Sequence, residues 1–231
     1  MSKKASSTGL DPVRAKAQAR RQFDAWAGTY DRSVLHHFLF GPSYVVLAEE
    51  IGRWYRERLP ESFRVLDVGC GTGTLAYLVA RAGWPVSVVG LDYAPAMCAQ
   101  AAGKAGSGDL ARRIRFTAGD SEHLPFADGS FDVVTCSNSF HHYPHQQTVV
   151  SEMRRLLRPG GRLILVDGFR DNVVGWVVFD VIIGHVEKDV YHAPWPVIQG
   201  YFETAGLADI RRRKFNLIFP LLATIGDAPT G

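Results

Sequence analysis

An apolar run that ends in a glycine-rich turn restricts this chain to few folds. Residues 65–73 read Val-Leu-Asp-Val-Gly-Cys-Gly-Thr-Gly. The apolar residues predict a buried strand, and Gly69, Gly71 and Gly73 leave no Cβ atoms where the strand meets the next helix, so a ligand can lie against the backbone. The spacing is GxGxG rather than the GxGxxG of a dinucleotide fingerprint, and Asp67 already places a carboxylate at the strand end. Both features argue against a pyrophosphate ligand.

Two further acids follow apolar runs. Asp92 ends the run at 86–91, a position from which a carboxylate can accept hydrogen bonds from both hydroxyls of a ribose. Asp120 comes directly after a third run, where an acid can meet the edge of an adenine. Together with the glycine turn, these acids predict a binding site for a nucleoside-bearing cofactor.

The remaining pattern alternates between short apolar runs and helical stretches. The runs lie at about 63–68, 86–91, 114–118, 131–136 and 162–167. Nearly continuous hydrophobicity is typical of strands covered on both faces, which predicts an α/β fold with a parallel sheet and helices on each side. Helices are expected from Pro12 to about Gly28 and from near Pro42 to Arg58, and residues 158–161 are expected to form a turn before the fifth strand.

The ordered motifs resemble those of a known family. The segments VLDVGCGTG, LDYAPAM, GDSEHLPFADGSFDVV and LLRPGGRLILVDGF are similar to the motif series of class I S-adenosylmethionine-dependent methyltransferases. The likeness spans roughly residues 20 to 217, and it is greatest to the small-molecule, type-11 branch that includes the quinone-biosynthesis methyltransferases. It implies a Rossmann-like fold with a seven-stranded, mostly parallel sheet, helices on both faces, added N-terminal helices and a lid insertion.

The resemblance also implies a set of residues that bind S-adenosylmethionine. Asp67 would hold the methionine ammonium, Asp92 the ribose and Asp120 the adenine amine, while Tyr30 would close the methionine side. The full set expected to bind the cofactor is Tyr30, Asp67, Gly69, Cys70, Gly71, Asp92, Tyr93, Met97, Asp120, Ser121 and Ser137.

Candidate catalytic residues come from two polar segments. Methyl transfer from a sulfonium is an in-line displacement, and a base helps when the acceptor is a hydroxyl or an acidic carbon. His141 and His142 follow the fourth strand, although one of them could only brace the loop. Tyr191 and His192 belong to a second cluster that could contact the acceptor. We expect no metal, because tight ligand spacing is missing.

The chain is expected to form one methyltransferase domain over residues 21–231 after a disordered basic tail at 1–20. Residues 21–58 would form cap helices, and 170–200 a cover over the substrate. The apolar helix at 173–183 could line the acceptor pocket, pack in the core or form a homodimer face. The net charge of +3 is modest, and its basic clusters lack interleaved aromatic residues, so we expect no nucleic acid partner.

Cysteine usage and hydropathy suggest the cellular location. The three cysteines show no CxxC pairing, which fits a reducing cytoplasm. No apolar stretch reaches the ~18 residues needed to cross a bilayer. We therefore expect a cytoplasmic protein without a membrane span.

The sequence favours methylation of an oxygen or carbon atom in a small-molecule acceptor. Two alternatives remain: a nicotinamide-dependent oxidoreductase, which shares the strand, glycine turn and distal acid, and a regulator that binds S-adenosylmethionine without catalysis. Nucleic acid methyltransferases fit poorly, because Ser137-Asn138-Ser139-Phe140 stands where an adenine enzyme carries Asn-Pro-Pro-aromatic.

Overall fold

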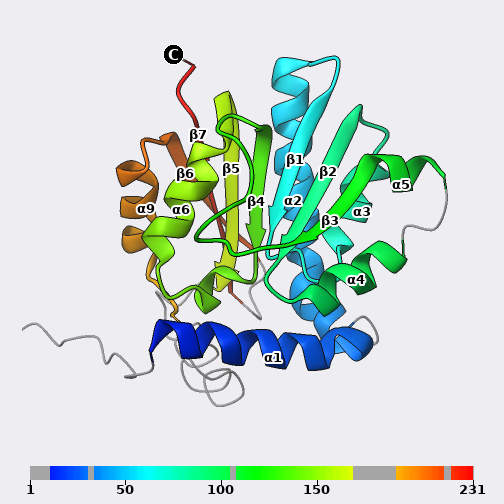
Figure 1. The fold of residues 1–231 in the computed structure, drawn as a ribbon. Helices are drawn as coiled ribbons and strands as arrows, with labels where there is room; N and C mark the ends of the chain where they lie inside the picture. The colour runs from blue at the N-terminus through cyan, green and yellow to red at the C-terminus, as the bar shows by residue number, and fades with distance from the viewer. Residues whose placement is uncertain (1–10, 31–33, 105–107, 169–190, 216–219, 231) are drawn as a thin grey trace, which may run out of the picture.

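The structure is a computed structural model that describes residues 11–30, 34–104, 108–168, 191–215 and 220–230. Its strands form one seven-stranded sheet in the order β3-β2-β1-β4-β5-β7-β6 (Figure 1). β1 to β5 pair in parallel, and β7 runs antiparallel to both β5 and β6. The expected seven-stranded, mostly parallel sheet is confirmed. The strands are β1 (Phe63–Val68), β2 (Val86–Asp92), β3 (Ile114–Ala118), β4 (Phe131–Ser137), β5 (Leu157–Gly168), β6 (Ala208–Phe215) and β7 (Leu221–Asp227).

Helices cover both faces of this sheet. α2 and α3 pack on one face through residues such as Leu47 and Leu75, and α6 and α9 pack on the other through residues such as Val150 and Phe202. The described helices are α1 (Pro12–Tyr30), α2 (Val34–Arg58), α3 (Thr74–Ala80), α4 (Pro95–Gly103), α5 (Asp109–Arg113), the 3-10 turn η1 (Phe140–His142), α6 (Gln146–Arg155) and α9 (Trp195–Thr204).

The N-terminal boundary differs from the expected one. α1 begins at Pro12, so residues 12–20 are helical and are not part of a disordered tail. α2 begins at Val34, upstream of Pro42, which lies inside the helix. Proline removes one backbone donor, but the helix continues past it because Leu47 and Ile51 are buried against the sheet.

Two expectations nearer the C-terminus also change. Residues 158–161 lie within β5, at an irregularity where the pairing with β4 shifts register, and do not form a separate turn. In the expected cover at 170–200, the last residues belong to α9, which starts at Trp195 and buries Ile198 in the core, while the cover itself stays a prediction. The apolar stretch at 173–183 lies outside the described residues.

The first helix crosses the edge of the sheet where the parallel strands end. In Figure 1, α1 runs beneath the carboxyl ends of β1 to β5, and the opposite edge carries the chain's C-terminus. Ala27 of α1 packs on Ala94 and Met97, at the start of α4. This is the edge at which open α/β sheets bind ligands, at the point where the strand order reverses between β1 and β4.

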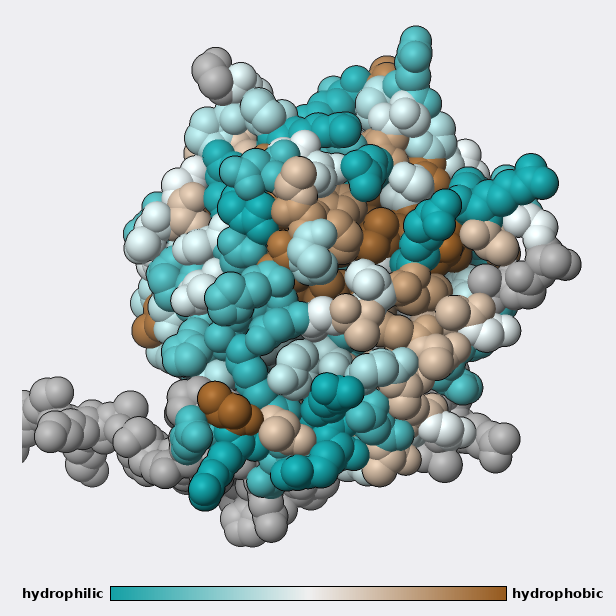
Figure 2. Space-filling model, viewed as in Figure 1, coloured by the Kyte–Doolittle hydropathy of each residue, from teal (hydrophilic) through white to brown (hydrophobic). Residues whose placement is uncertain are grey.

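The visible surface is mixed in polarity. Figure 2 shows apolar side chains on the sheet face beside α6, while the outer face of α1 is largely hydrophilic. Among the described helices, none is both long and apolar enough to span a bilayer.

We predict that Phe202→Ala will lower the free energy of unfolding by about 3–5 kcal/mol, because the ring is fully buried and its loss leaves a cavity. Urea unfolding checks this value. The control is Val197→Ala on the same helix, where the side chain is 40% exposed and the expected cost is within about 0.5 kcal/mol. Equal, small costs for both variants would show that α9 does not belong to the folded core.

Candidate functional site

A cleft opens at the carboxyl edge of the sheet, between the strand ends and α1. Its empty volume is about 960 Å³, part of it open to solvent, which suits a nucleoside-sized ligand. Its walls come from α1, α2 and the turns that follow β1, β2, β3 and β4. The lining residues are Lys16, Ala19, Arg20, Phe23, Phe40, Tyr44, Asp67, Gly69, Cys70, Gly71, Thr72, Asp92, Tyr93, Ala94, Met97, Asp120, Ser121, Ser137, Asn138, Ser139, His142 and Tyr143.

The glycine turn forms the floor of this cleft. Gly69 has φ +72°, and a Cβ atom there would collide with Ser139 and with the Tyr143 hydroxyl. Gly71 has φ +52°, but a Cβ there would meet no atom within 4 Å. The backbone at Gly71 therefore faces open space that a ligand can fill, which is the arrangement expected of a turn that holds a cofactor.

Asp67 presents a buried carboxylate to the cleft. It is 3% exposed, and its Oδ1 accepts a hydrogen bond of 2.8 Å from the Thr135 hydroxyl. Burial raises the pKa of Asp67 to about 7, although the bond from Thr135 acts to lower it. A carboxylate held this way gains most from a cationic ligand group, because a nearby positive charge would favour the ionised form.

Asp92 ties the two central turns together. Its Oδ2 accepts a bond of 2.8 Å from the Gly71 amide, and its Oδ1 one of 2.9 Å from the Ala94 amide. Burial raises the pKa of this carboxyl, although both backbone bonds act to lower it. A carboxylate has about four acceptor positions, so these two bonds do not exhaust its capacity to accept from ligand hydroxyls.

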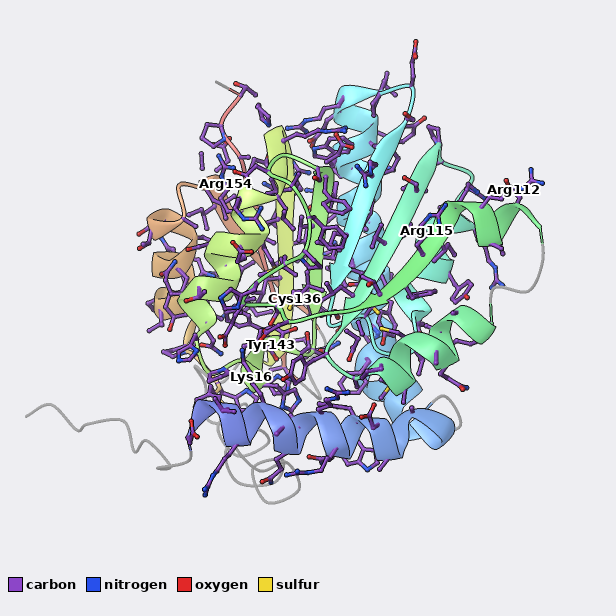
Figure 3. All side chains as sticks on the ribbon, viewed as in Figure 1. Lys16, Arg112, Arg115, Cys136, Tyr143 and Arg154 are labelled. Carbon is purple, nitrogen blue, oxygen red and sulfur yellow. The ribbon has the colours of Figure 1, made fainter. Side chains whose placement is uncertain are left out.

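Asp120 meets a lysine that the sequence had placed in a disordered tail. Lys16 Nζ lies 3.1 and 2.9 Å from the two Asp120 oxygens and 2.8 Å from Glu122 Oε2. Figure 3 shows Lys16 rising from α1 toward the sheet edge, below Tyr143. Burial acts to raise the pKa of Asp120, but the bonds from Lys16 and the Glu122 amide outweigh it, so this pKa is lowered.

The two histidines after β4 have different surroundings. His142 lines the cleft, and its ring packs edge-on against Phe23 with the ring centroids 5.1 Å apart. His141 is buried behind it, with its Nδ1 at 2.6 Å from Asp167 Oδ1 and its amide donating to Asp167 Oδ2 at 2.9 Å. The rings of His141 and His142 lie 4.2 Å apart. Only His142 of this pair can meet a ligand in the cleft directly.

Asp167, at the end of β5, holds this loop in place. Burial acts to raise its pKa, but the charges of His141 and His192 and the bond with His141 outweigh burial, so the pKa of Asp167 is lowered. An ionised Asp167 keeps the proton of His141 on Nδ1. The sequence contains a signal for this residue, because Asp167 follows an apolar run, as Asp67 and Asp92 do.

Tyr191 and His192 lie beside His141 but do not line the cleft. The Tyr191 amide donates to the His141 carbonyl at 2.6 Å, and the His192 ring stacks on His141 at 4.8 Å. One ligand atom each of His141, Asp167 and His192 lie within 4.8 Å of one another, a spacing that could hold a metal ion. The Asp167 oxygens already accept three N–H groups, from His141 and Gly168. The absence of a metal stays a prediction.

Aromatic side chains line part of the cleft. They are Phe23, Phe40, Tyr44 and Tyr143, and the Phe23 ring packs against His142. Burial raises the pKa of Tyr143 well above its usual range, and its hydroxyl lies 3.1 Å from Ser139 Oγ. Tyr143 is therefore a neutral hydrogen-bonding group and not a base at neutral pH.

The structure brings most of the expected cofactor-binding residues together. Of the set predicted from sequence, all but Tyr30 line the cleft; Tyr30 ends α1, and its side chain lies outside the described residues. Of the four expected catalytic residues, only His142 lines it. Sequence reasoning missed Lys16, although the helix expected from Pro12 would have carried that residue into the fold.

We predict that Gly69→Ala and Gly71→Ala will differ sharply in stability. Both force alanine into the left-handed region, which costs about 1–2 kcal/mol, but only Gly69→Ala adds a collision, with Ser139 and Tyr143. Urea unfolding should therefore show a larger loss for Gly69→Ala. A similar loss in both variants would contradict the open space at Gly71.

Comparison with known proteins agrees with this geometry. Residues 66–165 match a family model described as a methyltransferase domain. The chain is 43% identical to the demethylmenaquinone methyltransferase of Deinococcus radiodurans over 104 residues, which cover 45% of this chain and 42% of the relative. It is 35% identical to the 27-O-demethylrifamycin SV methyltransferase of Amycolatopsis mediterranei over 154 residues, covering 63% and 56% respectively. The matches thus span about half the length of these relatives.

A solved structure shares the fold over most of the chain. The magnesium protoporphyrin IX methyltransferase of Synechocystis PCC 6803, with bound SAH, aligns with a TM-score of 0.70 at 21% identity, covering 92% of this chain and 99% of that one. At this identity the likeness concerns the fold. Residues 66–165 therefore match a methyltransferase domain, and the chain has the fold of the magnesium protoporphyrin IX methyltransferase.

Proposed function

We propose that this protein transfers the methyl group of S-adenosylmethionine to an oxygen or carbon atom of a small-molecule acceptor. The observation that carries the proposal is a single cleft that collects Asp67, Asp92, Asp120 and His142 around an open glycine turn. Three acids would meet the three polar parts of the cofactor, and the histidine stands where an acceptor would enter. Two relatives are named as methyltransferases of demethylmenaquinone and of 27-O-demethylrifamycin SV, and both names support a small-molecule acceptor.

The residues of the cleft fit the cofactor. Asp67 would bind the ammonium of the methionine part, the backbone at Gly71 would lie against that part, and Asp92 would accept bonds from the ribose hydroxyls. Asp120, which Lys16 keeps ionised, would accept a bond from the adenine amine. When bound, the cofactor supplies a sulfonium-linked methyl group that reacts by in-line displacement.

The chain itself would orient the acceptor, exclude water and remove a proton. Phe23, Phe40, Tyr44 and Tyr143 would cover the reacting centre with apolar rings. His142 would take the proton of the acceptor hydroxyl or carbon acid, because it is the histidine that reaches the cleft. Burial raises the pKa of Cys136 to about 12, so this thiol stays protonated and offers no covalent nucleophile.

The same observations bear on partners and location. Arg211 and Arg213, in the basic segment of β6, lie close to Glu49 and Glu50. Much of their charge is therefore neutralised, which supports a small molecule over a nucleic acid as the acceptor. Three free, buried cysteines support a reducing cytoplasm. A homodimer through residues 173–183 stays a prediction, because that stretch lies outside the described residues.

A direct test separates this function from its alternatives. The protein is titrated with S-adenosylmethionine and with NADH by calorimetry, and then incubated with methyl-labelled S-adenosylmethionine and fractionated small molecules. We expect binding of the first ligand only and label in a small-molecule product. Binding without any labelled product in every fraction would favour a regulator, and binding of NADH alone would favour an oxidoreductase.

We predict that the affinity for S-adenosylmethionine will fall as the pH drops below 7. The pKa of Asp67 is about 7 in the free protein, and a bound ammonium would lower it, so binding releases a proton. One pH unit below that value, about a tenth of Asp67 is ionised, so the affinity should be about tenfold lower than that of the protein with Asp67 fully ionised. Calorimetry between pH 5.5 and 7.5 measures this, and Asp67→Asn should bind weakly with a flat profile. A flat wild-type profile would remove Asp67 from the ammonium site.

We predict that His142→Gln will lower kcat at least about 100-fold, the usual contribution of a general base, while changing the cofactor Kd less than about twofold. The acceptor used in this assay is the small molecule that becomes labelled in the experiment with methyl-labelled S-adenosylmethionine. His123→Gln is the control, since that side chain is exposed on the loop after β3. Unchanged kcat with a raised KM for the acceptor would show that His142 only contacts the acceptor and takes no proton.

A further inference from the structure

Helix α1, which forms one wall of the cleft, is held at two places along its length. Its second half packs on α4: Ala27 contacts Ala94 and Met97, and the Ala96 amide donates to Asp24 Oδ1 at 3.2 Å. Its first half reaches the body of the protein through Lys16, which bonds both Asp120 and Glu122 on the loop after β3. The first half, therefore, is secured by charge, while the second is secured mainly by packing.

The Lys16 contact is more buried than a surface ion pair. The side chains of Lys16, Asp120 and Glu122 are 18%, 33% and 8% exposed. Burial acts to lower the pKa of Lys16, but its bonds to the two carboxylates outweigh burial and raise this pKa. The lysine thus stays charged at every physiological pH, and low exposure protects the interaction from screening by salt.

One of the two carboxylates also belongs to the cofactor site. Asp120 lines the cleft beside Lys16, and it is the acid expected to face the adenine amine. Both of its oxygens lie within hydrogen-bond distance of Lys16 Nζ, whereas Glu122 gives the lysine a second, separate partner. The amine of a bound adenine can therefore take one Asp120 oxygen while Lys16 keeps the other oxygen and Glu122.

We propose that Lys16 is a positioning residue that latches α1 over the bound cofactor, and that cofactor release requires this contact to break. This inference rests on the proposed function, because it takes the ligand to be S-adenosylmethionine. The Glu122 bond keeps the helix closed while Asp120 serves the adenine. The latch slows release more than it strengthens any one contact to the ligand.

The test compares Lys16→Gln with Arg21→Gln, which removes a positive charge from an exposed position on the same helix. Labelled S-adenosylmethionine is first bound to the protein, and an excess of unlabelled cofactor is then added to prevent rebinding. The dissociation rate of the label is measured by filter binding. We expect Lys16→Gln to dissociate roughly tenfold faster, as truncation of a buried charge pair mainly changes koff, and Arg21→Gln to change it less than about twofold. An unchanged koff in Lys16→Gln would overturn the latch.

A double-mutant cycle separates a latch from a loss of stability. Glu122→Gln removes the second partner and leaves Asp120 intact. If the two residues act through one contact, the double variant should dissociate no faster than Lys16→Gln alone, and urea unfolding should show that every variant is folded under the conditions of the binding assay. Multiplicative effects of the two changes on koff would overturn the proposal.

The two proposals fail in different ways. Normal binding with unaltered release in Lys16→Gln overturns the latch and leaves the proposed function standing. No binding of labelled S-adenosylmethionine by the wild-type protein overturns both. Faster release from Lys16→Gln in a protein that labels no acceptor supports the latch and points to a regulator that binds the cofactor without transferring its methyl group.

Discussion

The hydrogen bonds of Asp92 join the parts of the site that come from different strands. Its two oxygens accept from the amides of Gly71 and Ala94, so the turn after β1 and the start of α4 are fixed to the end of β2. Parallel pairing of β1 with β2 brings these segments together, and the carboxylate then fixes their spacing. The bond to Asp92 satisfies the Gly71 amide and helps to hold the open face of this glycine toward the cleft. A residue expected only to bind ribose thus also builds the floor of the cleft.

Two acids near strand ends, Asp67 and Asp167, have different electrostatic states, and their neighbours explain why. Asp67 has one hydroxyl partner and no nearby cation among the described residues, so burial dominates and its pKa rises to about 7. Asp167 is as deeply buried, but two histidines face it and three N–H groups donate to it, so its pKa is lowered. Asp67 and Asp167 thus occupy similar positions near the ends of parallel strands. The carboxylate of Asp67 is suited to bind a cationic ligand group, whereas that of Asp167 is already bonded to groups of the protein.

Much of the fold, and most of the residues that line the cleft at the strand ends, could be predicted from sequence, because both follow from local patterns. Apolar runs marked the parallel strands, and an acid or glycine after a strand end must lie at the carboxyl edge whatever the remaining topology. The assignment of His141 and His142 could not be made, since which of two adjacent side chains faces the cleft is decided by η1 and by Asp167, 26 residues beyond His141. Lys16 was missed for the same reason: its partners lie 104 and 106 residues away in the chain, and no local pattern records that contact.

The balance of charges in the cleft gives a reason for the lysine on α1. The cleft presents the carboxylates of Asp67, Asp92 and Asp120, whereas a bound S-adenosylmethionine brings a sulfonium and an ammonium against one carboxylate of its own. Before the cofactor enters, burial alone would push these acids toward their neutral forms, as the raised pKa values of Asp67 and Asp92 show. Lys16 keeps Asp120 ionised, and it does so from α1 rather than from the strand ends that carry Asp67 and Asp92. The lysine is paired with Asp120 and Glu122, and no cation among the described residues contributes to the pKa of Asp67. The acid proposed to receive the ammonium of the ligand is thus left without a competing cation.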